Sequence, residues 1–222
     1  MRKAIVIVAA GLALLLMAGV ALAKFEPKLE LKLSDTKVKG HPAFDIHLEF
    51  AEDDDEIGLF TMMVPKGFDV APDDAIEEDE LLGGGTIEIA FGPGCRPDTG
   101  SVFPVRPTIE VSADILEKDR TDEEQDAGVH AVWFLDLEPL NRVRLLIEGS
   151  KKTGWTVSGA PTPSDNTCNP LIVDLTINAE SESGVPLVTN HKKPGKKVFK
   201  VDITNQDGSE TAHFDIPIKF TR

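Results

Sequence analysis

Carboxylates are the residues of this chain whose type and spacing point most directly to chemistry. Acidic residues gather in three stretches, 52–56, 73–80 and 119–126. Carboxylate oxygens on loops suit Ca²⁺, so Asp53, Asp55 and Glu56 are the candidate calcium ligands. An EF-hand loop beginning at Asp53 would need glutamate at its twelfth position, which is Val64. Because charge runs usually form solvated loops, we predict no metal and no cofactor, with calcium as the alternative.

Two histidines lie close in sequence to aspartates. His47 is two residues from Asp45, and His213 is two residues from Asp215. Residues two apart share one face of a strand, where a proton relay or a metal could use them. The opposite face carries the apolar residues, so we interpret both pairs as parts of a solvated polar face.

Three short motifs are similar to the signature set of the penicillin-recognising acyl enzymes. Residues 34–37 fit S-x-x-K, residues 152–154 fit K-T-G and residues 164–166 fit S-D-N. In that family the serine and lysine open a helix, whereas Ser34 ends an alternating run, and K-T-G here precedes S-D-N. We therefore predict no catalytic residues and no enzyme activity. The alternative is a secreted hydrolase whose carboxylates or serine converge only in the fold.

The first 23 residues have the parts of a secretory signal peptide. An Arg-Lys pair precedes the uncharged apolar run 4–23, which we expect to be helical. Ala21 and Ala23 supply the small residues of a cleavage site, so Lys24 would become the mature N-terminus. An uncleaved anchor is the alternative, because the run is also long enough to span a bilayer, and it would be the protein's membrane contact. Either outcome places the remainder in the medium or the extracytoplasmic cell envelope.

Export also bears on the two cysteines. Cys95 and Cys168 form an even pair set among Gly, Pro and Asn, without a Cys-x-x-Cys motif. In an oxidising compartment such a pair favours a structural disulfide. The chain-entropy model gives a loop of this length about 4 kcal/mol of stabilisation.

The net charge limits the partners. It is −15 for the whole chain and −17 once Arg2 and Lys3 are removed with the leader. Such a surface repels phosphate backbones and anionic headgroups, so we predict no nucleic-acid partner. The charge remains compatible with an envelope protein or polymer as the partner.

Alternation of apolar and polar residues is the main structural pattern of the chain. It predicts strands at 29–33, 44–50, 58–64, 86–91, 108–116, 129–137, 143–148, 171–178, 198–204 and 211–220. A turn is expected at Gly83–Gly85 and a short helical turn at 74–82. Pro217 lies in the last run, which should be an edge strand or carry a bulge.

These strands predict an all-β, antiparallel β-sandwich over residues 24–222, preceded by the helical signal peptide 1–23. Two sandwiches that divide near 117–127 are the alternative. Residues 194–208, in which Pro-Gly opens an alternating run and Asp-Gly closes it, resemble the closing hairpin of bacterial immunoglobulin-like extracellular modules. The resemblance implies an immunoglobulin-like sandwich. We expect an exported, non-catalytic binding or structural module.

Overall fold

The computed structural model describes residues 25–51, 57–91, 108–137, 141–161 and 168–222. Within these ranges neither helix has the length and hydropathy that crossing a membrane requires. Several predicted features lie outside the described residues, namely the leader 1–23 with Ala21, Ala23 and Lys24, the calcium candidates Asp53, Asp55 and Glu56, and Cys95.

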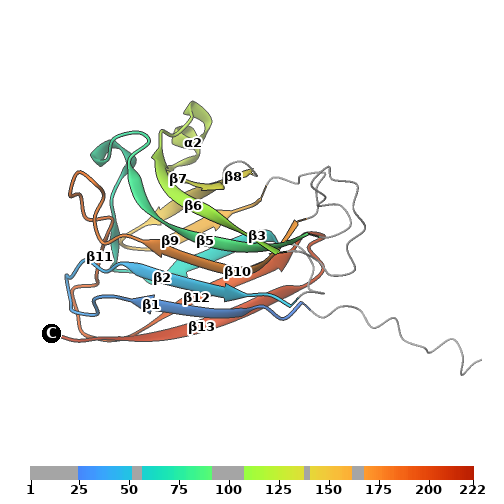
Figure 1. Ribbon diagram of the computed structural model, residues 1–222. Coiled ribbons are helices and arrows are strands. Elements are labelled where there is room, and N and C mark those ends of the chain that lie inside the picture. Colours follow the sequence, from blue (N-terminus) through green and yellow to red (C-terminus); the bar gives the residue numbers. More distant parts are fainter. Residues whose placement is uncertain (1–24, 52–56, 92–107, 138–140, 162–167) are drawn as a thin grey trace, which may run out of the picture.

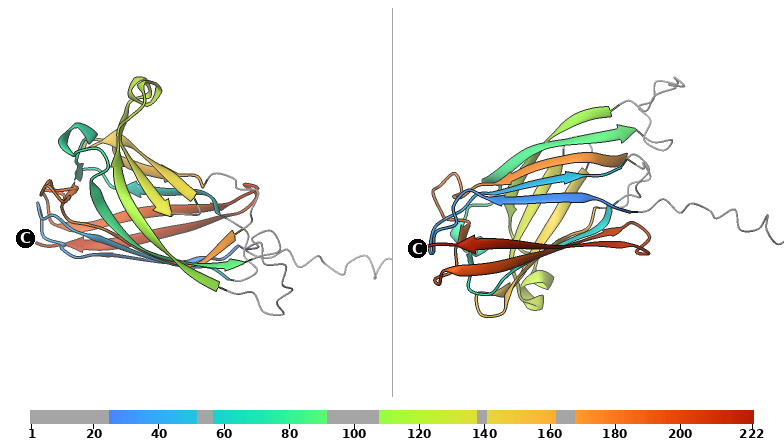
Figure 2. Two further views of the ribbon diagram at one scale, coloured as in Figure 1. Left: turned by 45° about the horizontal axis from the view of Figure 1, so that its top comes forward. Right: turned by 90° about the horizontal axis from the view of Figure 1, so that it is seen from below.

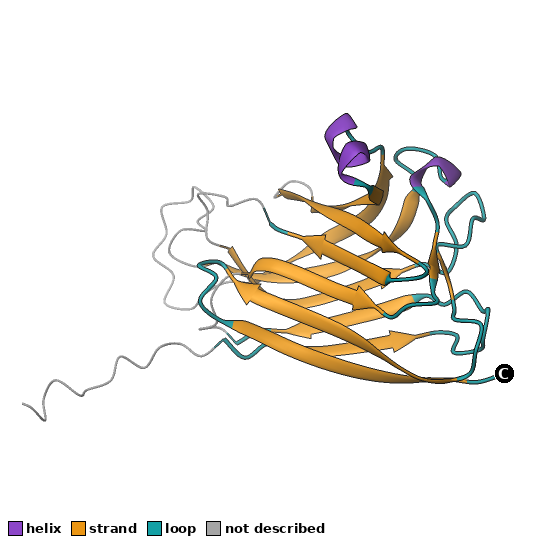
Figure 3. Cartoon of the chain, turned by 180° about the vertical axis from the view of Figure 1, so that it is seen from behind, coloured by secondary structure: helices purple, strands orange, loops and turns teal. Residues whose placement is uncertain are grey.

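The described chain consists mainly of antiparallel strands (Figure 1), which confirms the predicted all-β class. The strands are β1 (Lys28–Leu33), β2 (Phe44–Glu49), β3 (Ile57–Val64), β4 (Asp69–Val70), β5 (Leu81–Phe91), β6 (Thr108–Lys118), β7 (Val129–Leu137), β8 (Asn141–Ser150), β9 (Gly154–Gly159), β10 (Cys168–Ile177), β11 (Val188–Thr189), β12 (Gly195–Asn205) and β13 (Thr211–Phe220). A 3₁₀ turn η1 (Asp73–Ala75) and a helix α2 (Asp122–Ala127) lie near one another in space (Figure 3).

Eleven strands form one sheet in the order β1-β2-β10-β5-β6-β7-β8-β9-β3-β12-β13, and β4 pairs with β11 in a second, two-stranded sheet. Every neighbouring pair in the large sheet is antiparallel. The sheet curves until it is nearly closed into a barrel (Figure 2). The finer prediction of an immunoglobulin-like sandwich is not confirmed.

Four phenylalanines hold the curved sheet together from inside. Phe44 on β2 packs edge-on against Phe199 on β12, with ring centroids 6.1 Å apart. Phe68 contacts both Phe199 and Phe220 at 5.3 Å. All four side chains are buried. Because β2 and β12 are each next to an edge strand, the cluster joins the two ends of the sheet.

Hydrogen bonds join the segments that flank the two edge strands, just beyond each end. Beyond β1, Thr36 O accepts from Thr221 N at 2.9 Å, and Val38 N donates to Thr221 O at 2.9 Å. At the opposite end, Phe25 N donates to Glu210 Oε2 at 2.8 Å. The seam, defined as the space between β1 and β13, is therefore pinned at both ends.

The glycine triplet Gly83–Gly85 lies within β5, so the predicted turn was wrong. A Cβ at Gly83 would lie 2.0 Å from Thr176 O, and one at Gly85 would lie 1.8 Å from Asp174 O. The backbone of β10 thus approaches β5 too closely for side chains at these two positions. Glycine marks a close approach here rather than a turn.

The predicted helical turn at 74–82 was also wrong in extent. Only η1 is helical there, and β5 begins at Leu81. The α-helix is α2, in the acidic stretch that follows β6. Thr121 and Glu124 form a reciprocal capping box at its start, and Gly128 ends it with φ 82°. The Thr-x-x-Glu spacing was a sequence signal for this helix.

Pro217 lies on β13, which is the last strand of the sheet, as the edge-strand prediction required. The N–H and C=O of Thr221 form hydrogen bonds on the side of the strand that faces the seam. Because alternate residues of a strand direct their backbone groups to the same side, Pro217 directs its nitrogen into the seam as well. Proline therefore removes no hydrogen bond from the β12–β13 ladder.

The phenylalanine cluster yields a stability prediction. Replacing Phe199 with Ala removes a fully buried ring, and we expect the free energy of unfolding to fall by about 3–5 kcal/mol. The neighbouring Val198 is 38% exposed, so Val198→Ala should change it by about 0.5 kcal/mol or less. Urea denaturation of both variants measures the difference. Equal midpoints would show that the cluster does not hold the sheet closed.

Candidate functional site

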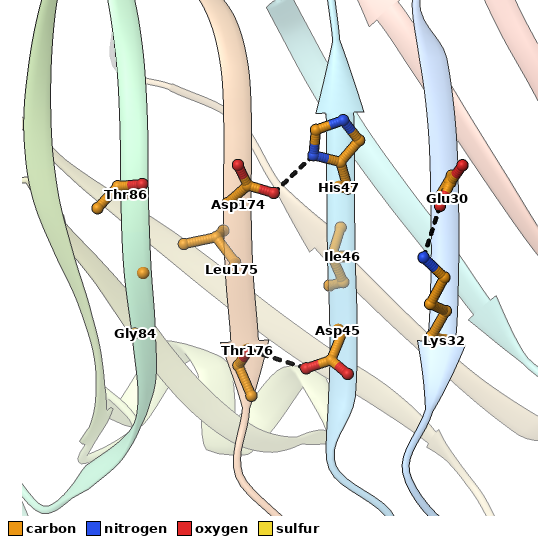
Figure 4. Close-up of a pocket in the computed structure, with 11 residues that line it drawn as sticks. Glu30, Lys32, Asp45, Ile46, His47, Gly84, Thr86, Asp174, Leu175 and Thr176 are labelled. Carbon is orange, nitrogen blue, oxygen red and sulfur yellow. Dashed lines mark hydrogen bonds and ion pairs between the residues drawn. The ribbon is translucent and has the colours of Figure 1, made fainter.

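A groove crosses the outer face of the sheet over β1, β2, β10 and β5 (Figure 4). Its volume is about 630 Å³. The residues that line it are mostly polar: Glu30, Lys32, Asp45, Ile46, His47, Gly84, Gly85, Thr86, Asp174, Leu175 and Thr176. Their carboxylate, ammonium, imidazole and hydroxyl groups come from four strands and three separate parts of the chain.

Strand register places these groups in rows. In one row Glu30 is opposite His47, His47 is opposite Asp174, and Asp174 is opposite Thr86. The intervening residues, such as Leu31 and Leu48, turn inward and are buried. Burial of that apolar face fixes the register, because a slip of one residue would turn the polar rows into the core.

His47 is held between two carboxylates. Its Nδ1 lies 2.5 Å from Asp174 Oδ1, and its Nε2 lies 3.3 Å from Glu49 Oε1. The hydrogen bond to Asp174, followed by the one to Glu49, raises the pKa of His47 above its ordinary value. An ionised carboxylate only accepts hydrogen bonds, so this arrangement favours the imidazolium form, in which both nitrogens donate. Both ring nitrogens of His47 are thus engaged by carboxylates of the same face.

His47 and His213 each contact a carboxylate of a neighbouring strand rather than the aspartate two residues away. Asp45 instead accepts from Thr176 Oγ1 at 2.9 Å. On the other wall of the molecule, His213 Nδ1 lies 2.8 Å from Asp202 Oδ1, which comes from the neighbouring strand. Directly opposed residues on paired strands lie closer together than residues two apart on one strand.

A glycine leaves the floor of the groove open. Gly84 is opposite Thr176 on β10 and opposite Asp114 on β6. Its Cα therefore belongs to an outward-facing row but carries no side chain. A Cβ there would lie 2.7 Å from Ala113 O, so a larger residue would require the backbone to shift.

The motifs similar to those of the acyl enzymes serve turns. Ser34 Oγ accepts a hydrogen bond from Ala43 N at 2.8 Å, just beyond the β1–β2 ladder. Residues 152–154 belong to the β8–β9 hairpin, where Thr153 Oγ1 lies 2.9 Å from Ser150 Oγ. Residues 164–166 lie outside the described part. Both hydroxyls that can be placed thus stabilise local backbone structure.

Metal coordination finds no support within the part of the chain that the structure describes. No cluster of three or more His, Cys, Asp or Glu side chains there could hold an ion. The carboxylates of the groove are instead engaged by cations and hydroxyls. Glu30 Oε2, for example, is 2.7 Å from Lys32 Nζ.

The sheet also buries a carboxyl group that the sequence did not single out. Glu117 on β6 is fully buried, opposite Trp133 on β7, and neither carboxylate oxygen has a hydrogen-bond partner among the described residues. Burial, followed by the nearby charge of Asp119, raises the pKa of Glu117 to about 8. Its place in the inward row of β6, after Ala113 and Ile115, was the signal that the alternation offered.

Comparisons with protein-family models, with characterised proteins and with solved structures found no match for this chain.

Glu117 makes stability depend on pH in a definite direction. Its raised pKa means that the folded state holds the proton more tightly than the unfolded chain, for which the ordinary value is 4.5. The resulting stabilisation is complete below pH 4.5 and is lost as pH rises toward 8, by at most about 1.4 kcal/mol per pH unit. Glu117→Gln should remove this decline and be more stable than the natural protein at pH 9.

Glu110→Gln provides the matched control, because Glu110 is an exposed glutamate of the same strand. Chemical denaturation between pH 5 and 9 measures the slope for all three proteins. A Glu117→Gln variant that kept the natural slope would show that Glu117 does not carry the proton.

Proposed function

We propose that this chain is an exported, non-catalytic β module that binds a polar ligand of the cell envelope or medium at the groove over β1, β2, β10 and β5. The observation that carries the proposal is the double engagement of His47 by Asp174 and Glu49. Both ring nitrogens of His47 are engaged there, and the raised pKa favours a positive charge between the two carboxylates. The secreted-hydrolase alternative gains no comparable support.

The groups around the groove indicate the chemistry of the ligand. Carboxylates of Glu30, Asp45 and Asp174 accept hydrogen bonds, while Lys32 and His47 supply positive charge. Neighbouring strands repeat such groups about every 4.8 Å, which an extended ligand can contact in series. A polymer bearing hydroxyl and amino groups therefore fits better than a compact apolar molecule.

Export remains part of the proposal. The signal peptide with cleavage before Lys24 and a disulfide between Cys95 and Cys168 are both inferred from sequence. The likeness of residues 194–208 to immunoglobulin-like extracellular modules is inferred in the same way.

Filling the groove should abolish ligand capture. Thr86→Phe adds a ring at the lining, and we expect immobilised variant protein to retain at least tenfold less solubilised envelope polymer, since each lost contact weakens binding. Thr61→Phe makes the same change at a half-buried threonine on β3, outside the groove, and should bind as the natural protein does. Equal capture by both variants would rule out the groove as the site.

The exported product can be weighed directly. Intact-mass spectrometry of protein recovered outside the cytoplasm should show a chain that begins at Lys24. The same spectrum should lack the mass of two hydrogen atoms, which reduction restores. A product that keeps the leader and carries free thiols would contradict cleavage and the disulfide together.

A further inference from the structure

The two edges of the large sheet face each other across the seam. β1 and β13 are the first and last of eleven strands, and Figures 1 and 2 show them side by side. Since each neighbouring pair is antiparallel, an odd number of strands makes these two run parallel. The isolated bridge between Lys37 and Thr221 is parallel accordingly.

β1 and β13 are separated by more than one strand spacing. Their Cα atoms lie more than 8 Å apart along nearly all of their length. Hydrogen-bonded strands lie about 4.8 Å apart, and a strand inserted between two others needs about 9.6 Å. The pins at Thr221 and Glu210 lie just beyond the ends of the two strands, so the unpaired stretch is about as long as β1.

Backbone groups on both edges point into the seam. Ser34 N donates to Ala43 O on the β2 side, so the alternate residues Leu29, Leu31 and Leu33 direct their N–H and C=O groups away from β2. On β13 the residues in phase with Thr221 do the same from the other side. These are His213, Asp215, Pro217 through its carbonyl, and Lys219.

On both β1 and β13, side chains that point toward the core alternate with side chains that point outward. Toward the core, Leu29, Leu33, Phe214, Ile216 and Ile218 are only partly buried, although they pack on the core. On β12, which has a paired neighbour on each side, the inward residues Val201 and Ile203 are by contrast fully buried. Outside, the seam is flanked by polar side chains, among them charges of both signs: Lys28, Glu30, Lys32, His213, Asp215 and Lys219.

We propose that the seam binds an extended peptide of a partner protein, which inserts antiparallel to both β1 and β13 and completes a twelve-stranded, wholly antiparallel barrel. Its alternate side chains are apolar, covering the half-buried leucines and isoleucines, and the intervening ones are charged or polar. A second copy that paired through one edge strand would use only one of the two sets of backbone groups. The inference concerns a different surface from the groove and stands without it.

A test uses a synthetic peptide with the sequence of residues 197–204, which alternates in this way and pairs antiparallel with β13 inside the protein. The control peptide has the same composition with its apolar residues grouped together. Amide hydrogen exchange is followed on the full chain with and without each peptide. The first peptide should slow exchange at Leu29, Leu31, Leu33, His213, Asp215 and Lys219 by about tenfold or more.

A matched pair of variants tests the pairing itself. Asp215 is exposed, so Asp215→Pro removes one N–H that faces the seam and leaves the β12 ladder intact. Asp215→Ala keeps that N–H. Fluorescence anisotropy with the labelled peptide should show affinity weaker by about threefold or more in the proline variant than in the alanine variant.

Equal affinities, binding without protection of the seam-facing amides, or equal binding of the control peptide would each overturn the proposal. Concentration-dependent protection of the same amides without peptide would overturn it in favour of a second copy of the chain. Amide hydrogen exchange of the natural protein tests peptide binding at the seam even if a variant folds poorly.

Discussion

The constraint on which this structure depends is that an antiparallel sheet with an odd number of strands cannot close on itself by antiparallel pairing. Eleven strands curve until β1 and β13 face one another in parallel, yet the two do not pair along their length. Closure is left to the buried phenylalanines around Phe199 and to the pins at Phe25 and Thr221. Packing of the interior therefore does what a last hydrogen-bonded ladder would do in a closed barrel.

Much of the fold could be predicted because most strands bury only one face. In such strands apolar and polar residues alternate, and this alternation is visible in the sequence. β1, β2 and β13 keep that alternation from end to end. Glycine misled the prediction at Gly83–Gly85, since a residue without a side chain suits both a turn and a close backbone approach. Strand order could not be read at all, because pairs such as β2 with β10 join distant parts of the chain.

The difference between local alternation and pairing of distant strands also explains which features of the candidate site could be predicted from the sequence. The outward face of β2 was visible in the sequence, but the partner of His47 comes from Asp174, far along the chain. Register across strands, which no local spacing reveals, decides such contacts. Glu117 interrupts an apolar inward row, so its burial was implied by the alternation. Its lack of a hydrogen-bond partner among the described residues depends on contacts between strands, which the sequence does not show.

The groove and the seam meet at β1, where Glu30 and Lys32 lie beside both of them. Glu30 and Lys32 form the wall of the groove with side chains that point outward. The seam is bordered by backbone groups of Leu29, Leu31 and Leu33, which alternate with them in the sequence. β1 is only six residues long and has a hydrogen-bonded neighbour on one side. A strand bound in the seam would give β1 a second ladder and so hold the wall of the groove in place, which links the two surfaces through one short strand.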